Sequence, residues 1–152
     1  MPIGTVTYSF LSVNATIVGP NGIIVMGDGS APAEEGITVE QAEPTNTRVN
    51  GADGSWMHSL HAGRPGRITF RFLKNSPTNA LLSAMCNADL SNAATHGQNI
   101  ITITNVLTGD VITGQGCAFS QQPNIGYAKD GVPVEWVFDV GRVTEMLGAG
   151  VQ

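Results

Sequence analysis

Between Arg67 and Phe72, apolar and polar side chains alternate with the period of two that is typical of a strand with one buried face. Ile68, Phe70 and Phe72 fall on the face predicted to be buried, and Arg71 falls on the opposite, polar face. The alternation therefore predicts a half-buried strand.

A helix is predicted directly after this strand, over about residues 76–91. Ser76 stands where a helix N-cap belongs, and Pro77 follows at the first helical position, where its missing N–H costs nothing. The side chains that recur at helical spacing and form the predicted apolar stripe are Leu81, Leu82, Ala84, Met85 and Ala88. This segment is predicted to pack one side on a sheet.

Other stretches of the chain carry strand patterns, separated by turn sequences. They are residues 5–18, with a bend near Phe10 and Leu11, then 23–26, 37–40, 100–106, 111–120 and 132–140. Residues 27–36 are interpreted as a turn region, and residues 141–152 as a short tail or half-turn of helix. About seven or eight antiparallel strands with one flanking helix predict a mainly β fold, a β-sandwich or open β-barrel.

Residues 43–66 form a long connection with many glycines and prolines and little periodicity. Connections of this length inside a compact domain are usually functional or disordered. Apolar and aromatic side chains that seek burial argue against disorder, namely Trp56, Met57 and Leu60. We interpret the segment as an extended loop or hairpin arm that packs against another subunit, with residues 51–54 at its tip. A loop folded back on its own core stays open as the alternative.

The charge content of the chain is low. Only 12% of the 152 residues are charged, whereas about 25% is typical of soluble domains. Because interface cores are depleted in charge, this composition favours an assembling subunit over a stable monomer with a neutral polar surface. The length predicts one domain over residues 1–152.

Composition also limits the partners. A net charge of −5, with seven scattered Lys and Arg residues, argues against tight binding of nucleic acid. No apolar run is long enough to suggest a membrane anchor, and the N-terminal residues do not resemble a signal peptide, so synthesis and assembly in a cytoplasm are expected. Cys86 and Cys117 are predicted to be buried free thiols.

The sequence offers little chemistry. His58 and His61 are three residues apart but lack a third ligand at metal-binding spacing. Gly27–Gly29 and Gly114–Gly116 lack the lysine of a phosphate-binding loop. We therefore predict that the protein is not an enzyme and has no cofactor or metal.

Several phrases of the sequence resemble one family of bacteriophage structural proteins, the tail tube proteins of contractile-tailed phages, which are related to the tubes of type VI secretion and pyocin machines. The phrases are residues 7–19, 34–40, 51–54, 58–63, 73–85 and 127–131. The resemblance implies a β-sandwich or barrel with one helix. It also implies homohexameric rings whose inner strands form one continuous barrel, and rings that stack into a hollow tube inside a sheath.

The implied function is mechanical: sheath contraction drives the tube through the host envelope, and the genome passes down the lumen. The implied partners are other copies of the chain, the sheath, the baseplate or initiator and tail-terminator proteins, and the tape measure protein and DNA inside the lumen, without specific binding. The implied location is the virion. Two alternatives stay open: another virion subunit, such as a capsid decoration or tail-terminator protein, and a monomeric ligand-binding β-sandwich.

If the protein is a tail tube subunit, as the resemblance implies, two groups of residues are candidates for function. The predicted contacts between rings or subunits are Trp56, Met57, His58, Leu60, His61 and Arg71, with Arg71 proposed for an intersubunit ion pair. The candidates for lining the lumen are Glu40, Glu43, Thr102 and Thr104.

Overall fold

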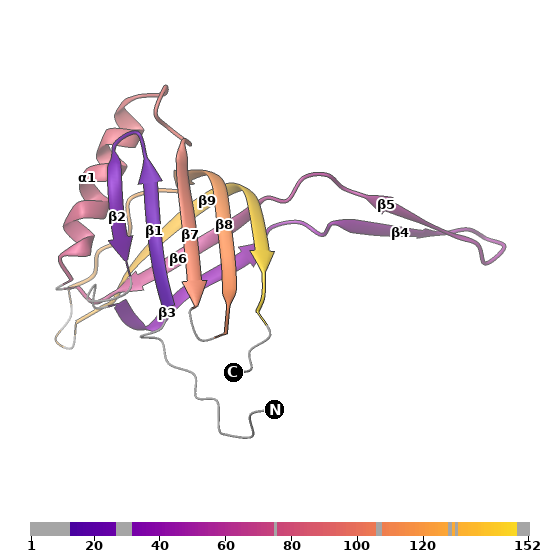
Figure 1. Ribbon diagram of the computed structural model, residues 1–152, viewed down its shortest axis with the longest axis horizontal. Coiled ribbons are helices and arrows are strands. Elements are labelled where there is room, and N and C mark those ends of the chain that lie inside the picture. Colours follow the sequence, from indigo (N-terminus) through magenta and orange to yellow (C-terminus); the bar gives the residue numbers. More distant parts are fainter. Residues whose placement is uncertain are drawn as a thin grey trace, which may run out of the picture.

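Among the residues that the structure describes, seven strands form one antiparallel sheet, and two more form a separate ribbon (Figure 1). The computed structural model describes residues 13–26, 32–74, 76–105, 108–127, 129 and 131–148. The strands are β1 (Val13–Gly19), β2 (Gly22–Met26), β3 (Pro32–Gln41), β4 (Asn46–Asn50), β5 (Trp56–Leu60), β6 (Gly66–Phe72), β7 (Asn99–Asn105), β8 (Asp110–Phe119) and β9 (Val134–Met146), with one helix, α1 (Thr78–Ser91). This confirms the predicted mainly β fold with one helix.

The large sheet has the strand order β2-β1-β7-β8-β9-β6-β3, with β2 and β3 as the two edges of its described part. It curls so that β6 and β3 pass behind β1 and β7, and α1 lies along the side where β2 forms the edge (Figure 1). The helix packs against β2 and β8. The apolar core therefore fills the concave side of one curled sheet.

The alternation in the strands decides which side chains enter this core. Ile68, Phe70 and Phe72 of β6 are buried as predicted. The ring of Phe138 on β9 meets Phe70 edge-on, with 5.7 Å between the centroids. Aromatic pairs in this geometry add to the stability that area burial supplies.

The helix buries a different stripe from the predicted one. Leu82, Met85 and Cys86 are buried, whereas Leu81 is 56% exposed; Ala84 is also exposed and Ala88 half-buried. The helix begins at Thr78, one residue later than predicted, so the N-cap residue is Pro77 and the prediction of Ser76 was wrong. The Thr78 N–H lies 3.4 Å from the Ser76 hydroxyl. Periodicity alone misplaced the stripe because its last member, Asp89, is a charged residue.

Asp89 is completely buried, and two side-chain amides compensate its carboxylate. The Asn21 amide donates to Asp89 Oδ1, and the Asn99 amide donates to Asp89 Oδ2 at 2.7 Å. A Cβ on Gly19 would lie 1.9 Å from the Asn99 oxygen, so only glycine leaves room for this amide. We call Asn21, Asp89 and Asn99 the polar clip, because it ties α1 to the β1–β2 turn and to β7.

Two sequence-based boundaries were wrong. Strand β3 begins at Pro32, inside the predicted turn region 27–36, and its pairing with β6 is irregular between Pro32 and Ile37. Strand β9 runs to Met146, where a tail or half-turn of helix was predicted. Its buried side chains change phase between Val140 and Val143, which breaks the period of two that the prediction followed.

The other boundaries agree with the prediction or lie outside the described residues. The hairpins β1–β2 and β7–β8 are formed as predicted. Residues 5–12, and with them the predicted bend near Phe10 and Leu11, lie outside the described part of the chain. Among the described residues, no helix is long and apolar enough to cross a membrane.

Candidate assembly surfaces

The segment predicted as an arm is a β-hairpin that projects from one side of the body (Figure 1). All side chains of β4 are exposed, and in β5 only Ser59 is partly covered. The loop from 51 to 55 joins the two strands at the tip. The hairpin prediction is confirmed, and the alternative of a loop folded back on its own core is excluded.

Polar contacts hold the arm in shape. Its tip is closed by the Gly51 N–H, which donates to the Ser55 carbonyl at 2.7 Å. The Ser55 hydroxyl and N–H both donate to Asp53, at 2.6 and 3.1 Å, and these bonds lower the pKa of Asp53. Nearer the base, Thr47 Oγ1 lies 2.7 Å from His61 Nε2. His61 therefore has a partner within the arm.

Apolar side chains lie on both faces of the arm. Residues directly opposite in an antiparallel pair share a face, and Asn50 pairs with Trp56 while Val49 pairs with Met57. Trp56 and Leu60 thus lie on one face, where they are 69% and 81% exposed. Val49 and Met57 lie on the other face and are also exposed. A two-stranded hairpin is at best marginally stable in water, so the arm gains most if both faces are covered.

The base of the arm is fixed to the body. The Ala42 N–H donates to the Pro65 carbonyl, and the Val143 N–H donates to the Arg64 carbonyl, each at 2.9 Å. Gly66 lets β3 and β9 pack closely on either side of β6. A Cβ at this position would lie 2.5 Å from the backbone carbonyl oxygen of Glu40 and 2.4 Å from a Val143 methyl group. The arm is therefore a continuation of the β3–β6 pair.

A second exposed apolar surface lies on the convex side of the sheet at its β2 edge. Ile23 and Val25 are exposed on β2, and Ile23 pairs with Val18, which in turn pairs with Ile100. Sequence reasoning identified the β2 strand but not this surface. The signal was available in the unbroken apolar run of residues 23–26 on a short strand.

The two cysteines are free and buried, as predicted. Burial raises the pKa of each thiol to about 11, and Asp89 adds to the effect at Cys86. Within the described ranges, no three side chains of the His, Cys, Asp or Glu type are grouped to hold a metal ion.

The family model for the bacteriophage PhiTE tail tube protein matches residues 5–148. The chain belongs to this phage tail tube family. The resemblance seen in the sequence is thereby confirmed, and membership identifies the protein as a phage tail component of a structural family. No curated protein is similar enough in sequence to match.

Solved structures of contractile injection systems share the fold of this tail tube family member. A chain from the extended PVC sheath/tube terminator structure superposes with a TM-score of 0.62 at 11% identity, over 95% of this chain and 99% of that chain. A chain from the extended PVC sheath-tube complex gives 0.54 at 11% identity, over 88% of each chain. A chain from the cap of the anti-feeding prophage tube gives 0.55 at 8% identity, over 97% and 95%.

In this tail tube family member, Arg71 has a partner inside its own chain. Arg71 Nε lies 3.0 Å from Glu135 Oε2, and a second guanidinium nitrogen lies 3.4 Å from the Thr38 hydroxyl. Glu135 is the directly opposite residue on β9. An intersubunit ion pair of Arg71 stays a prediction, and it would have to form in addition to this intramolecular pair.

The four candidates for lining the lumen do not lie together. Thr102 and Thr104 lie on the convex side of β7, where Thr102 belongs to a cross-strand row of uncharged residues with Thr16, Thr113 and Thr144. Glu40 lies on the edge strand β3 opposite Arg67, and Arg67 is opposite Asp139. Glu43 lies at the base of the arm. The convex side thus has an uncharged part and a charged part, and the assignment of either to the lumen stays a prediction.

Proposed function

We propose that this protein is the structural subunit of a phage tail tube. Six copies form a ring, rings stack into a hollow tube, and DNA passes through the tube when sheath contraction drives it through the host envelope. The observation that carries the proposal is the arm with apolar side chains on both faces. The family of the chain and its low charge content support the same conclusion.

The two-sided arm favours assembly into a tube over a simple dimer. An arm with one apolar face needs a single partner surface to cover it. This arm needs two partner surfaces, because Trp56 and Leu60 lie on one face and Val49 and Met57 on the other. A hairpin that lies between rings meets two surfaces, one on each side. We assign residues of β5 and its continuation to this contact, namely Trp56, Met57, His58, Leu60 and His61.

The other partners follow from the tube. We propose the sheath protein on the outside, baseplate or initiator and terminator proteins at the ends, and the tape measure protein and DNA inside. The DNA moves without specific binding, because affinity for phosphate grows with the number of Lys and Arg contacts and the chain carries seven such residues against twelve acidic ones. The protein assembles in the host cytoplasm and ends in the virion.

Negative-stain electron microscopy of the purified protein tests the proposal, with hollow filaments or stacked rings as the expected result. Trp56→Asp should abolish them, because it places a charge in an apolar contact. Trp56→Phe keeps the aromatic contact and should assemble. Ala93→Asp adds the same charge at an exposed turn position of the body and serves as the control. Tubes of normal length and yield from Trp56→Asp would contradict the role of the arm.

Fluorescence gives a second reading in solution. The chain has two tryptophans: Trp136 is already buried in the body, and Trp56 is exposed. Assembly should therefore shift the emission to shorter wavelength through Trp56 alone, and Trp56→Phe should lose this shift while it still assembles.

A tail terminator is the second candidate, because the chain from the terminator structure superposes with a TM-score of 0.62 and the chain from the sheath-tube complex with 0.54. A terminator would form single rings, whereas a tube subunit forms filaments. A monomeric ligand-binding sandwich would stay monodisperse at high concentration. The same micrographs separate the three, provided that an initiator complex is added if the purified protein fails to nucleate.

A further inference from the structure

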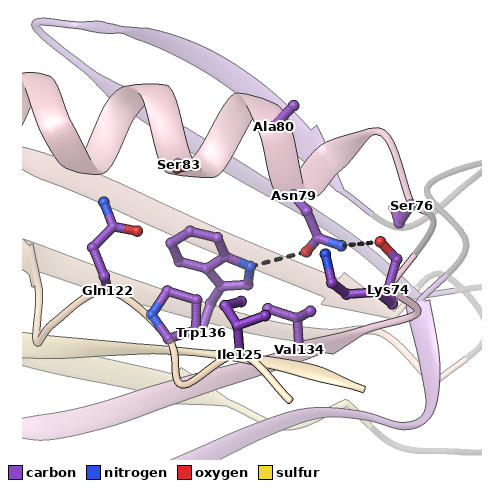
Figure 2. A pocket seen from close by; sticks show the side chains of 10 residues that line it. Lys74, Ser76, Asn79, Ala80, Ser83, Gln122, Ile125, Val134 and Trp136 are labelled. Carbon is purple, nitrogen blue, oxygen red and sulfur yellow. Dashed lines mark hydrogen bonds between the residues drawn. The ribbon is translucent and has the colours of Figure 1, made fainter. Parts of the chain in front are cut away.

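A cleft of about 460 Å³ opens between the start of α1 and the segment that leads from β8 to β9 (Figure 2). The residues of interest in its lining are Lys74, Asn79, Gln122, Ile125, Val134 and Trp136. Gln122 is held in place by the helix, since its amide donates to the Asn87 side chain at 2.8 Å. The cleft is thus walled by the helix on one side and by the 121–127 segment on the other.

The lining combines apolar surface with one positive charge. Trp136 Nε1 donates to Asn79 Oδ1 at 3.0 Å, so the indole N–H is satisfied within the chain (Figure 2). Ile125 is half exposed, and Tyr127 beside the cleft is strongly exposed. Lys74 Nζ lies 5.3 Å from the centre of the Tyr127 ring. An occupant of matching chemistry would bring an apolar or aromatic side chain and a negative charge.

The arm has this chemistry. Its exposed aromatic residue is Trp56, and the only charged residue between Val49 and Met57 is Asp53, at the tip. The hydrogen bonds from Ser55 fix the orientation of the Asp53 carboxylate, three residues before Trp56 in the chain. The arm therefore presents an indole and a carboxylate as one unit.

The arm and α1 lie on opposite sides of the body (Figure 1), so an arm cannot reach the cleft beside the helix of its own chain. We propose that the arm of a second copy docks in this cleft, with Trp56 against the exposed side of Ile125 and with Asp53 near Lys74. Two different surfaces then meet in each contact. Such a head-to-tail interface repeats from copy to copy and generates rings or filaments. The inference rests on the proposed function and names the surface on which one face of the arm packs.

Thiol cross-linking tests the contact directly. Asn50→Cys, directly opposite Trp56 on the arm, and Asn124→Cys, next to Ile125, are combined in one chain, and each is also made alone. Both positions are exposed and leave Trp56 and Ile125 in place, and the native Cys86 and Cys117 are buried and serve as an internal background. A short bifunctional thiol reagent is added to the assembled protein. The double variant should give a ladder of covalent oligomers on a denaturing gel, and each single variant should give none. Equal amounts of the two single variants, mixed before assembly, should give covalent dimers.

A charge exchange provides an independent readout. Asp53→Lys alone and Lys74→Glu alone should each weaken self-association about tenfold in analytical ultracentrifugation, and the two changes in one chain should restore much of the loss. Both positions are exposed, so these variants are expected to fold. Equal losses without restoration would contradict the predicted pairing of Asp53 with Lys74.

The outcomes separate this inference from the proposed function. Tubes or rings in the micrographs without a ladder from the double variant would overturn the docking of the arm in the cleft and leave the tube proposal standing. Covalent dimers from Asn50→Cys alone would mean that arms meet arms, which also overturns it. Monomers in the centrifuge and no cross-links at high concentration, even with an initiator complex, would overturn both.

Discussion

The body and the arm of this protein use their apolar side chains in opposite ways. In the body, Phe70, Trp136 and Phe138 are buried in one core cluster. In the arm, Trp56 and Leu60 are largely exposed and contact no core. Burial of apolar surface is the main source of folding free energy. The comparison therefore assigns stability to the body, whereas the apolar surface of the arm is left uncovered by the described part of the chain.

The largest effect on stability should come from the centre of the body. Phe138→Ala removes a fully buried ring that contacts Phe70 and Phe119, and it should lower the free energy of unfolding by about 3 to 5 kcal/mol. Chemical denaturation monitored by circular dichroism measures it, with Leu81→Ala, an exposed position on α1, as the control. A loss below about 1 kcal/mol would mean that the aromatic cluster does not carry the stability of the body.

The next effect should come from the polar clip. Asp89→Ala removes the acceptor of both the Asn21 and the Asn99 amide, and buried donors without partners are costly, so we expect a loss of about 2 to 3 kcal/mol. Asn21→Ala is the milder comparison, because Asn21 is exposed and Asn99 keeps its bond to Asp89. Hydrogen exchange should show the destabilisation as faster exchange in α1. Equal protection of α1 in both variants would contradict the role of the clip.

The body was largely predictable from the sequence because its strands alternate with one buried face. Ile68, Phe70 and Phe72 were assigned to the core on this pattern alone. The errors occur where a contact between distant parts of the chain, and not the local pattern, determines which side chains are buried. Leu81 fits the apolar period of the helix, but the side that is buried contains Asp89, whose carboxylate is compensated by Asn21 and Asn99 from distant parts of the chain. Such compensation depends on the tertiary fold and leaves no periodic signal.

The arm was predicted for a different reason, namely that residues 43–66 have little periodicity and many glycines and prolines, while Trp56, Met57 and Leu60 argue against disorder. The sequence could not indicate what covers the arm. The cleft beside Trp136 is built from the helix start, the 121–127 segment and β9, which come together only in the fold. The candidates for the lumen were chosen by residue type, and residue type does not tell which part of the convex side they occupy.

A smaller effect is expected from Arg71. Its side chain is neither fully buried like the core of the body nor fully exposed like the arm, and it is paired with Glu135 of the same chain. A double-mutant cycle with Arg71→Met and Glu135→Gln should give a coupling of about 0.5 to 1 kcal/mol in unfolding, as is usual for exposed pairs. If Arg71 also forms an intersubunit ion pair, Arg71→Met should weaken assembly more than Glu135→Gln does. Equal assembly of both variants would leave Arg71 with its intramolecular role alone.

The smallest effect on stability, and the sharpest test of the comparison, is expected for Trp56→Ala. A surface substitution away from special contacts usually changes the free energy of unfolding by less than about 0.5 kcal/mol, and Trp56 lies on an exposed hairpin without any contact to the core cluster. Denaturation of the variant below the concentration of assembly should therefore match the unmodified protein, while the proposed tubes should be absent from the micrographs. Trp136→Ala, the matched change in the body, should instead unfold the protein. If Trp56→Ala lowered the stability of the monomer as much as a core substitution does, the arm would be part of the fold, and the division between a stable body and an assembling arm would fail.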